Sequence, residues 1–231
     1  MSSSDSTEEG DFPATEKSKH PPTTRTTAPP IRYGVMCRRA PEGPFSFDDL
    51  IPGEGPRELE IGFGHGRFLI ERAVAAPGSR LLGIEIKTKW GHLVEQKRIQ
   101  KGLTNVVALA GDARDILPRL SPDGCLTRAY LHFPDPWWKT KHQKRRVLDE
   151  DFLLAMSRLL HAGGELFVQS DVEDRAVEMR DQIAEYALEG NGVFDVPHGF
   201  DVANPYGART NREARAAEDG LPVFRVIAIR R

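Results

Sequence analysis

Three acidic residues stand near the ends of three successive short apolar segments, where their carboxylates could bind a ligand. Glu60 belongs to R-E-L-E-I, just before glycines 62, 64 and 66; Glu85 belongs to L-L-G-I-E-I, and Asp112 follows V-V-A-L-A-G. Glycines let a backbone approach a ligand closely, and a carboxylate about 20 residues further on suits a ribose diol. Three acids repel a pyrophosphate but suit S-adenosylmethionine, which carries an ammonium, a sulfonium and a ribose.

Other ligands of glycine-rich turns fit this segment less well. The dinucleotide fingerprint G-x-G-x-x-G requires glycine at position 67, where Arg67 stands, so a nicotinamide-dependent dehydrogenase is disfavoured. No Gly-Lys-Ser/Thr follows, which excludes a phosphate-binding P-loop. Any one of these acids alone could equally be a helix cap, so the prediction rests on all three together. The residues predicted to bind the cofactor from these segments are Glu60, Gly62, Gly64, Glu85, Ile86, Asp112 and Ala113.

A second segment combines a stiff acidic turn with aromatic and basic residues. It reads L-H-F-P-D-P-W-W-K-T-K-H-Q-K-R-R over residues 131–146, and the two prolines restrict the backbone around Asp135. Five cations fall within residues 139–146, which is typical of a phosphate-binding surface. Cations at the start of a helix oppose the helix dipole, so stability alone does not explain them. Trp137 or Trp138 could stack on a base, although packing in the core is the commoner role.

Short apolar runs alternate with longer amphipathic ones from Arg57 onward. This alternation predicts βαβ units, and hence an α/β fold with a mostly parallel seven-stranded sheet and helices on both faces. Strands are expected at 58–61, 80–86, 106–110, 128–133, 165–169, 193–196 and 223–229. Helices are expected at 66–76, 88–101, 113–117, 144–160 and 172–188.

Composition limits the remaining possibilities. The 231 residues carry a net charge of −2, so any nucleic-acid binding must come from a local patch. Two cysteines are too few for a disulfide framework or a four-cysteine zinc site, no metal is predicted, and a reducing cytoplasm is expected. Residues 1–30 contain 16 Ser, Thr or Pro and no Leu, Ile or Val, which predicts a disordered tail. Residues 31–56 are expected to be a lead-in, and 57–231 the catalytic domain; no membrane span is expected.

The segment F-P-D-P-W-W-K-T-K-H-Q-K-R-R resembles the signature of the bacterial tRNA (guanine-N7-)-methyltransferases, the TrmB family. E-I-G-F-G-H-G and G-I-E-I are similar to that family's first two motifs. T-N-R-E at 210–213 and Q-S-D at 169–171 resemble two later ones. The resemblance covers about residues 57–231. It implies a class I (Rossmann-like) methyltransferase fold and a tRNA (guanine(46)-N7)-methyltransferase, which methylates a variable-loop guanine with S-adenosylmethionine.

The resemblance also implies roles for individual residues. Glu60, Glu85, Asp112 and Asp135 would line the cofactor and reaction site, and Asp135 would be catalytic. Guanine N7 carries a lone pair and no proton, so Asp135 would stabilise the developing purine charge rather than act as a base. Asp171 or Glu213 would hold the guanine edge. The residues expected to contact tRNA are Lys139, Lys141, Lys144, Arg145, Arg146, Asp171, Thr210, Asn211, Arg212 and Glu213.

Two other functions remain open at this stage. A class I methyltransferase acting on another RNA or on a protein would share the glycine loop and the acids. A non-catalytic RNA-binding module on the same fold is the second, and the presence of Glu60, Glu85, Asp112 and Asp135 speaks against it. The sequence leaves a monomer and a homodimer equally open.

Overall fold

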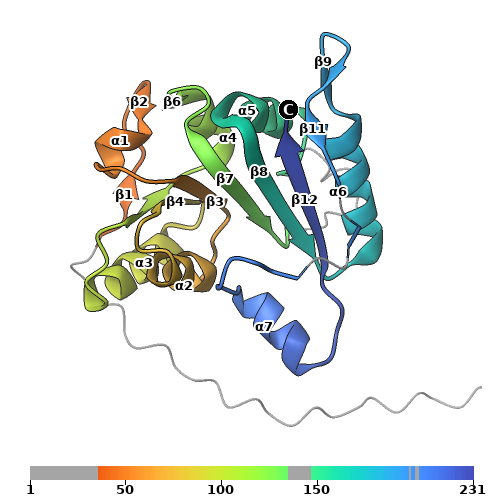
Figure 1. Cartoon of the computed structure of the whole chain (residues 1–231). Coiled ribbons are helices and arrows are strands. Elements are labelled where there is room, and N and C mark those ends of the chain that lie inside the picture. Colours follow the sequence, from red (N-terminus) through yellow and green to blue (C-terminus); the bar gives the residue numbers. More distant parts are fainter. Residues whose placement is uncertain (1–35, 135–146, 198, 201–202) are drawn as a thin grey trace, which may run out of the picture. The chain divides into compact units, whose positions relative to one another are not determined.

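The protein is described here from a computed structural model, which describes residues 36–134, 147–197, 199–200 and 203–231. Its centre is an eight-stranded sheet of order β1-β5-β4-β3-β7-β8-β12-β11 (Figure 1). The first six strands in that order run parallel, and β12 and β11 are antiparallel to their neighbours. Their bounds are β1 Arg38–Arg39, β5 Val106–Ala110, β4 Arg80–Glu85, β3 Arg57–Ile61, β7 Leu126–His132, β8 Leu160–Ser170, β12 Phe224–Arg230 and β11 Phe194–Asp195.

Helices connect the parallel strands. They are α1 Phe47–Leu50, α2 Arg67–Ala75, α3 Thr88–Gln100, α4 Ala113–Ile116, α5 Glu150–Leu159, α6 Glu173–Glu185 and α7 Asn211–Glu218, with a 3₁₀ turn at Leu117–Arg119. Two short pairs complete the described elements: β2 Phe45–Ser46 with β6 Leu120–Ser121, and β9 Ala187–Leu188 with β10 Asn191–Gly192. No helix among the described residues is long and apolar enough to cross a membrane.

The central strands bury side chains on both faces, as parallel strands covered by helices must. Along β5, Val106 and Ala108 join an apolar cluster with α2 and α3, whereas Val107 and Leu109 join a cluster on the opposite face. That opposite cluster also contains side chains of α1, α5 and α6. Successive side chains of β5 thus point to opposite faces of the sheet, and both faces are buried. This explains why the segment is continuously apolar in sequence.

The sheet has a topological switch point between β3 and β7. From β3 the chain proceeds outward to β4 and β5, and then returns to the other side of β3 to form β7 and β8. Ligands of open α/β sheets bind at the carboxyl ends of the strands at such a point. Helix α7 lies near the end of the sheet toward which the arrows of β7 and β8 point (Figure 1).

The predicted fold class is confirmed, and several details differ from prediction; β8, for example, begins at Leu160 and not at 165. The sheet has eight strands rather than seven, because Arg38 and Arg39 add β1 to β5. The strand predicted at 193–196 pairs only as Phe194–Asp195. The helix predicted from 144 begins at Glu150, because the Asp149 side chain accepts a hydrogen bond from Phe152 N; residues 144–146 lie outside the described residues. Helix α7 is not predicted, since half of its eight residues are charged and its only apolar residues are alanines.

Residues before Arg57 contribute to the core. Phe47 is fully buried and Leu50 is buried beside it in α1. Asp48 of α1 makes ion pairs with Arg57 at 2.7 Å and Arg80 at 2.6 Å, at the starts of β3 and β4. The lead-in therefore contacts the starts of β3 and β4 through α1, and the carboxyl end of β5 through β1. The domain boundary at 57 remains an expectation, and residues 1–30 lie outside the described residues.

Candidate active site

Two buried titratable groups meet where β3 and β7 end. Glu60 is 2% exposed and His132 is 8% exposed, with Glu60 Oε1 3.9 Å from His132 Nε2. Burial, with the nearby Glu85, raises the pKa of Glu60 well above its usual value. Burial lowers the pKa of His132 to about 3. Glu60 Oε2 and His132 Nε2 have no hydrogen-bond partner within the described part of the chain, so both remain available to a ligand.

Gln169, at the end of β8, determines which nitrogen of His132 carries the proton. Its side-chain Nε2 lies 2.9 Å from His132 Nδ1 and 3.3 Å from Glu213 Oε2. An amide NH₂ only donates, so His132 Nδ1 accepts and its Nε2 carries the hydrogen. The His132 imidazole therefore presents an N–H toward Glu60, and Gln169 has used both of its hydrogens.

The glycine loop joins β3 to α2 in a left-handed conformation that other residues rarely adopt. Gly62, Gly64 and Gly66 have φ of +72°, +52° and +68°. A Cβ on Gly66 would lie 2.0 Å from Val94 Cγ2, so Gly66 is required for packing of α2 on α3. A Cβ on Gly62 or Gly64 would meet no atom within 4 Å, which leaves open space for a ligand beside the backbone.

Glu85 holds this loop in place. Its carboxylate accepts hydrogen bonds from Gly64 N and Lys87 N, both at 2.9 Å. Since a carboxylate has about four acceptor positions, Glu85 retains capacity for a hydroxyl of a ligand. Ile86, the next residue, is 62% exposed and offers a free apolar surface.

Asp112 has a different environment from Glu60. Its side chain caps α4 by accepting from Arg114 N, and it forms an ion pair with the Arg114 guanidinium at 2.6 Å. Those hydrogen bonds from Arg114 lower the pKa of Asp112. Ala113 is the first residue of α4. The predicted row of three acids is thus two buried groups, Glu60 with an unpartnered oxygen and Glu85 bound to backbone amides, and one more exposed acid, Asp112, paired with arginine.

Phe133 leaves β7 in a strained conformation. Its φ is +47°, which is an outlier for a bulky residue, and its backbone N donates to Gln169 O at 2.7 Å. The Arg212 guanidinium lies over its ring, 5.3 Å from the centroid. Strain of this kind costs about 1–3 kcal/mol and clusters at functional sites. Phe133 begins the F-P-D-P-W-W segment, whose residues 135–146 lie outside the described residues.

The T-N-R-E motif forms the start of α7. Thr210 caps the helix by accepting from Glu213 N at 3.0 Å. Glu213 is 2% exposed, and its carboxylate accepts from Gln169, Asn204 and Arg225. Arg212 instead points outward and makes an ion pair with Asp171 at 2.6 Å, after the end of β8.

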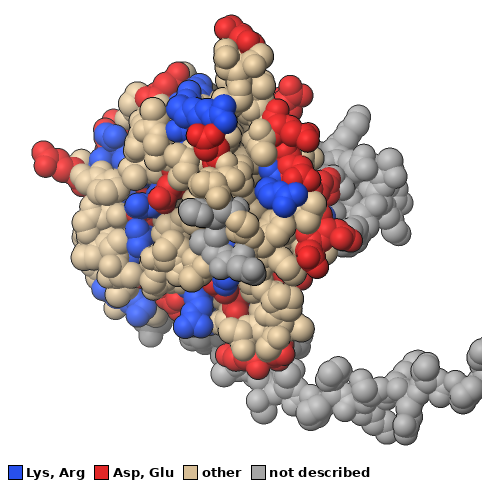
Figure 2. Space-filling view, turned by 45° about the vertical axis from the view of Figure 1, so that its right-hand side comes forward, with Lys and Arg blue, Asp and Glu red and all other residues tan. Residues whose placement is uncertain are grey.

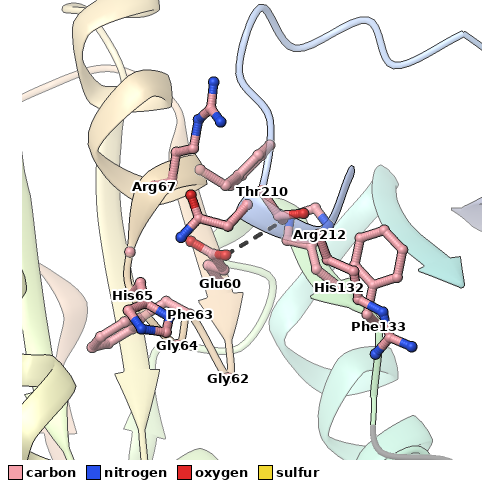
Figure 3. A pocket seen from close by; sticks show the side chains of 13 residues that line it. Glu60, Gly62, Phe63, Gly64, His65, Arg67, His132, Phe133, Thr210 and Arg212 are labelled. Atoms are coloured by element: carbon pink, nitrogen blue, oxygen red, sulfur yellow. Dashed lines mark ion pairs between the residues drawn. The ribbon is translucent and has the colours of Figure 1, made fainter. Parts of the chain in front are cut away.

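These elements enclose one pocket of about 180 Å³, shown in Figure 3. Its lining includes the predicted Glu60, Gly62, Gly64, Thr210, Asn211 and Arg212. Glu85, Ile86, Asp112, Ala113, Asp171 and Glu213 do not line it. Asp135, Lys139, Lys141, Lys144, Arg145 and Arg146 lie outside the described residues.

Several pocket residues were not predicted from the sequence. His132 was assigned to the sheet alone, and Phe133, His65 and Arg67 had no assigned role. The hydrogen bond between His132 and Gln169 follows from strand register, because the two residues are paired across β7 and β8. A polar residue at the end of each of two adjacent parallel strands is the signal that could have identified them.

Comparison with known proteins agrees with this geometry. A family model described as "Putative methyltransferase" matches residues 54–226. The tRNA (guanine-N(7)-)-methyltransferase of Nostoc sp. is 38% identical, over 74% of this chain and 78% of its own. That of Anaeromyxobacter dehalogenans is also 38% identical, over 77% of this chain and 91% of its own.

Solved structures share the fold at low identity. The 16S rRNA methyltransferase KamB superposes with a TM-score of 0.57 at 18% identity, over 85% of this chain and all of its own. An antibiotic-related methyltransferase gives a TM-score of 0.54 at 16% identity, over 79% of this chain and 92% of its own. The predicted class I methyltransferase fold is therefore confirmed. With the sequence relatives, it follows that the chain belongs to the tRNA (guanine-N(7)-)-methyltransferase family.

Proposed function

We propose that this protein transfers the methyl group of S-adenosylmethionine to N7 of guanine 46 in the variable loop of tRNA. One observation carries the proposal: a single pocket contains the glycine loop, the end of β7 that leads into F-P-D-P-W-W, and the T-N-R-E start of α7. The first of these suits the cofactor and the other two suit the nucleotide. Family membership supports the same assignment.

The residues present fit the proposed cofactor. Glu60 Oε2 is buried without a partner, which is costly unless a cationic group such as the cofactor ammonium occupies the pocket. Glu85 and Asp112 would accept from the ribose and the adenine amine, and Ile86 would contact the adenine face. Gly62 and Gly64 leave room for close backbone approach. When bound, S-adenosylmethionine supplies a methyl group activated by its sulfonium.

The chemistry requires orientation and charge stabilisation rather than a base. Guanine N7 already has an in-plane lone pair, so the protein must hold that lone pair in line with the methyl–sulfur bond. The purine ring becomes cationic during transfer, and we assign Asp135 to stabilise that charge. Asp135 follows Pro134 directly in the sequence, two residues after Phe133 with its strained backbone.

We assign the guanine edge to Asp171 rather than Glu213. Guanine presents N1–H and an amino group, which require acceptors. The Glu213 carboxylate is buried and already accepts from Gln169, Asn204 and Arg225. Asp171 is paired with the outward-pointing Arg212, which the guanine could displace. Lys139, Lys141, Lys144, Arg145 and Arg146 remain the proposed phosphate contacts, with Thr210, Asn211 and Arg212 beside the nucleotide.

The test is methylation of unmodified tRNA with labelled S-adenosylmethionine, followed by cleavage chemistry specific for 7-methylguanine to locate the product. We expect one methylated position, at guanine 46, and none in a tRNA with adenine there. Asp135→Asn should lower turnover about 100-fold while leaving the affinity for S-adenosylhomocysteine within twofold. Asp219→Asn, an exposed acid after α7, is the matched control. Wild-type turnover in Asp135→Asn would refute the role of Asp135.

A further inference from the structure

A cluster of cations and aromatic rings borders the pocket on the side of α3. We call it the His65 rim and define it as His65, Lys89, Trp90, Lys97 and Arg215. The His65 and Trp90 rings lie 3.8 Å apart between centroids, and Lys89 Nζ lies 4.5 Å from the Trp90 centroid. Lys97 Nζ donates to His65 O at 2.8 Å. His65 itself lines the pocket.

Three cations from two helices act on the same imidazole. The pKa of His65 is lowered by partial burial first, and then by the positive charges of Lys97, Arg215 and Lys89; Glu85 acts in the opposite direction. Lys89 and Lys97 belong to α3, and Arg215 belongs to α7. Positive potential therefore concentrates beside the glycine loop.

No carboxylate offsets these charges directly. Within the described ranges, no carboxylate forms an ion pair with Lys89, Lys97 or Arg215; the other described lysines also lack one, whereas most described arginines have one. Lys87 caps α3 without a side-chain hydrogen bond, and the first turn of α3 contains no acid. Lys87 and Lys89 therefore add to the positive end of the helix dipole, which opposes stability.

One face of the molecule shows how its charges are distributed. On the face shown in Figure 2, lysines and arginines are dispersed among acidic residues and form no continuous patch. The chain as a whole carries a net charge of −2. A polyanion is therefore attracted by local clusters and not by the overall field. Exposed cations beside an aromatic ring are the arrangement that binds nucleic-acid phosphates and bases.

We propose that the His65 rim is a second tRNA-binding surface, which contacts phosphates on the α3 side of the pocket. This inference rests on the proposed function for the identity of the RNA. The rim is separate in sequence from residues 139–146, so tRNA would be held by cations from two parts of the chain. Exposed Lys89 and Arg215 supply phosphate contacts, and Lys97 keeps the His65 backbone in position.

The experiment compares Lys89→Ala/Arg215→Ala with wild type in equilibrium binding to unmodified tRNA over a range of salt concentrations. Two lost phosphate contacts should reduce the slope of log K against log salt by about 1.4–1.8. In steady-state assays the KM for tRNA should rise while kcat at saturating tRNA stays unchanged. Lys101→Ala/Arg180→Ala removes two cations elsewhere, an exposed lysine and a half-buried arginine paired with Asp181, and should leave the slope unchanged. Lys89→Arg/Arg215→Lys should restore wild-type binding.

Each alternative has its own outcome. An unchanged salt slope in Lys89→Ala/Arg215→Ala would overturn the proposal, as would weaker binding of S-adenosylhomocysteine with normal tRNA binding, which would assign the rim to the cofactor. Loss of thermal stability would indicate a structural role, whereas the proposal predicts an unchanged or higher Tm because repulsion is removed. If wild type binds tRNA but forms no 7-methylguanine, the proposed function fails while the binding comparison still tests the rim.

Discussion

His132 Nε2 lies 3.9 Å from Glu60 Oε1 at the junction of β7 and β3, and burial disfavours the charged form of both side chains. Both residues face the pocket with an unpartnered polar atom, within the part of the chain that the structure describes. The pair is more costly to fold than two apolar residues would be. That cost is offset only when a ligand supplies the missing hydrogen bonds, so Glu60 is preorganised for a donor such as an ammonium, and His132 Nε2–H for an acceptor.

The first prediction concerns the release of a proton from Glu60 when a ligand binds. Because burial raises the pKa of Glu60 in the free protein, binding a ligand ammonium should lower that pKa and release the proton wherever the free protein holds one. Calorimetric titration of S-adenosylhomocysteine in two buffers of different ionisation enthalpy should detect the release as the pH is lowered from neutral towards the ordinary pKa of a glutamate. Glu60→Gln should abolish it and weaken binding about 10–100-fold, since a hydrogen bond to a charged group is lost. Identical apparent enthalpies in both buffers for wild type would contradict the assignment.

A second prediction concerns the pH dependence of stability. The pKa of folded His132 is about 3, against an ordinary 6.5, so only the unfolded chain takes up this proton as pH falls below 6.5. The free energy of unfolding should therefore fall by about 2 kcal/mol between pH 6.5 and 5 on account of His132. Glu60 acts in the opposite direction, since its folded-state pKa is raised. In urea denaturation, the free energy of unfolding should accordingly fall by about 2 kcal/mol less in His132→Asn than in wild type over this pH range. The same pH dependence in both proteins would rule this out.

The third prediction separates backbone strain from steric clash at the glycine loop. Gly66→Ala combines φ of +68° with a Cβ 2.0 Å from Val94 Cγ2, and should cost about 2–5 kcal/mol in denaturant unfolding. Gly43→Ala is the matched control, because Gly43 has φ of +71° and no atom within 4 Å of a built Cβ. It should cost only the conformational strain, about 1 kcal/mol. Equal losses would show that packing against Val94 is unimportant.

A fourth prediction distinguishes the two acids near α7. Glu213→Gln removes a buried charge that pairs with Arg225 at 2.9 Å, and should lower the free energy of unfolding by about 3 kcal/mol. Asp171→Asn breaks a partly exposed pair with Arg212 and should cost less than about 1 kcal/mol. In tRNA methylation the larger effect should come from the other acid: Asp171→Asn should raise the KM for tRNA while the fold stays intact. A stable Glu213→Gln variant with impaired tRNA binding would instead make Glu213 the guanine contact.

The sequence predicts the central architecture well, because β3, β4, β5 and their helices have the periodicities of their elements. Val106–Ala110 matches its predicted strand at both ends, and α3 begins at Thr88 as expected. Helix α7 escapes prediction because tertiary contacts stabilise it: Glu213 is buried among partners from β8 and β12, and no apolar stripe announces the helix. Strand β1 escapes because two exposed arginines carry no strand pattern, and their pairing with β5 joins residues far apart in the sequence.

Only part of the site can be predicted from the sequence, for a related reason. Glu60 and the glycines are recognisable because their roles are local, being set by the turn after β3. The roles of His132 and Gln169 depend on the register of β7 against β8, which brings two polar residues together across 37 positions of chain. The same dependence separates Glu213 from Arg212, because one α-helical step turns one side chain inward and the next outward.

The two hydrogens of Gln169 have a consequence for how the protein's ligands affect each other. One hydrogen is shared with His132 beneath the glycine loop, and the other with Glu213 in α7. A movement of α7 that frees Glu213 also frees the amide to rotate, and with it the imidazole that faces Glu60. Binding of a ligand at the Glu213 end of this hydrogen-bond series therefore changes the free energy of binding at the His132 end. Thermodynamic linkage requires the effect to be reciprocal. A ligand that steadies α7 should tighten the hold on the methyl donor, and the donor should tighten the hold on that ligand by the same factor.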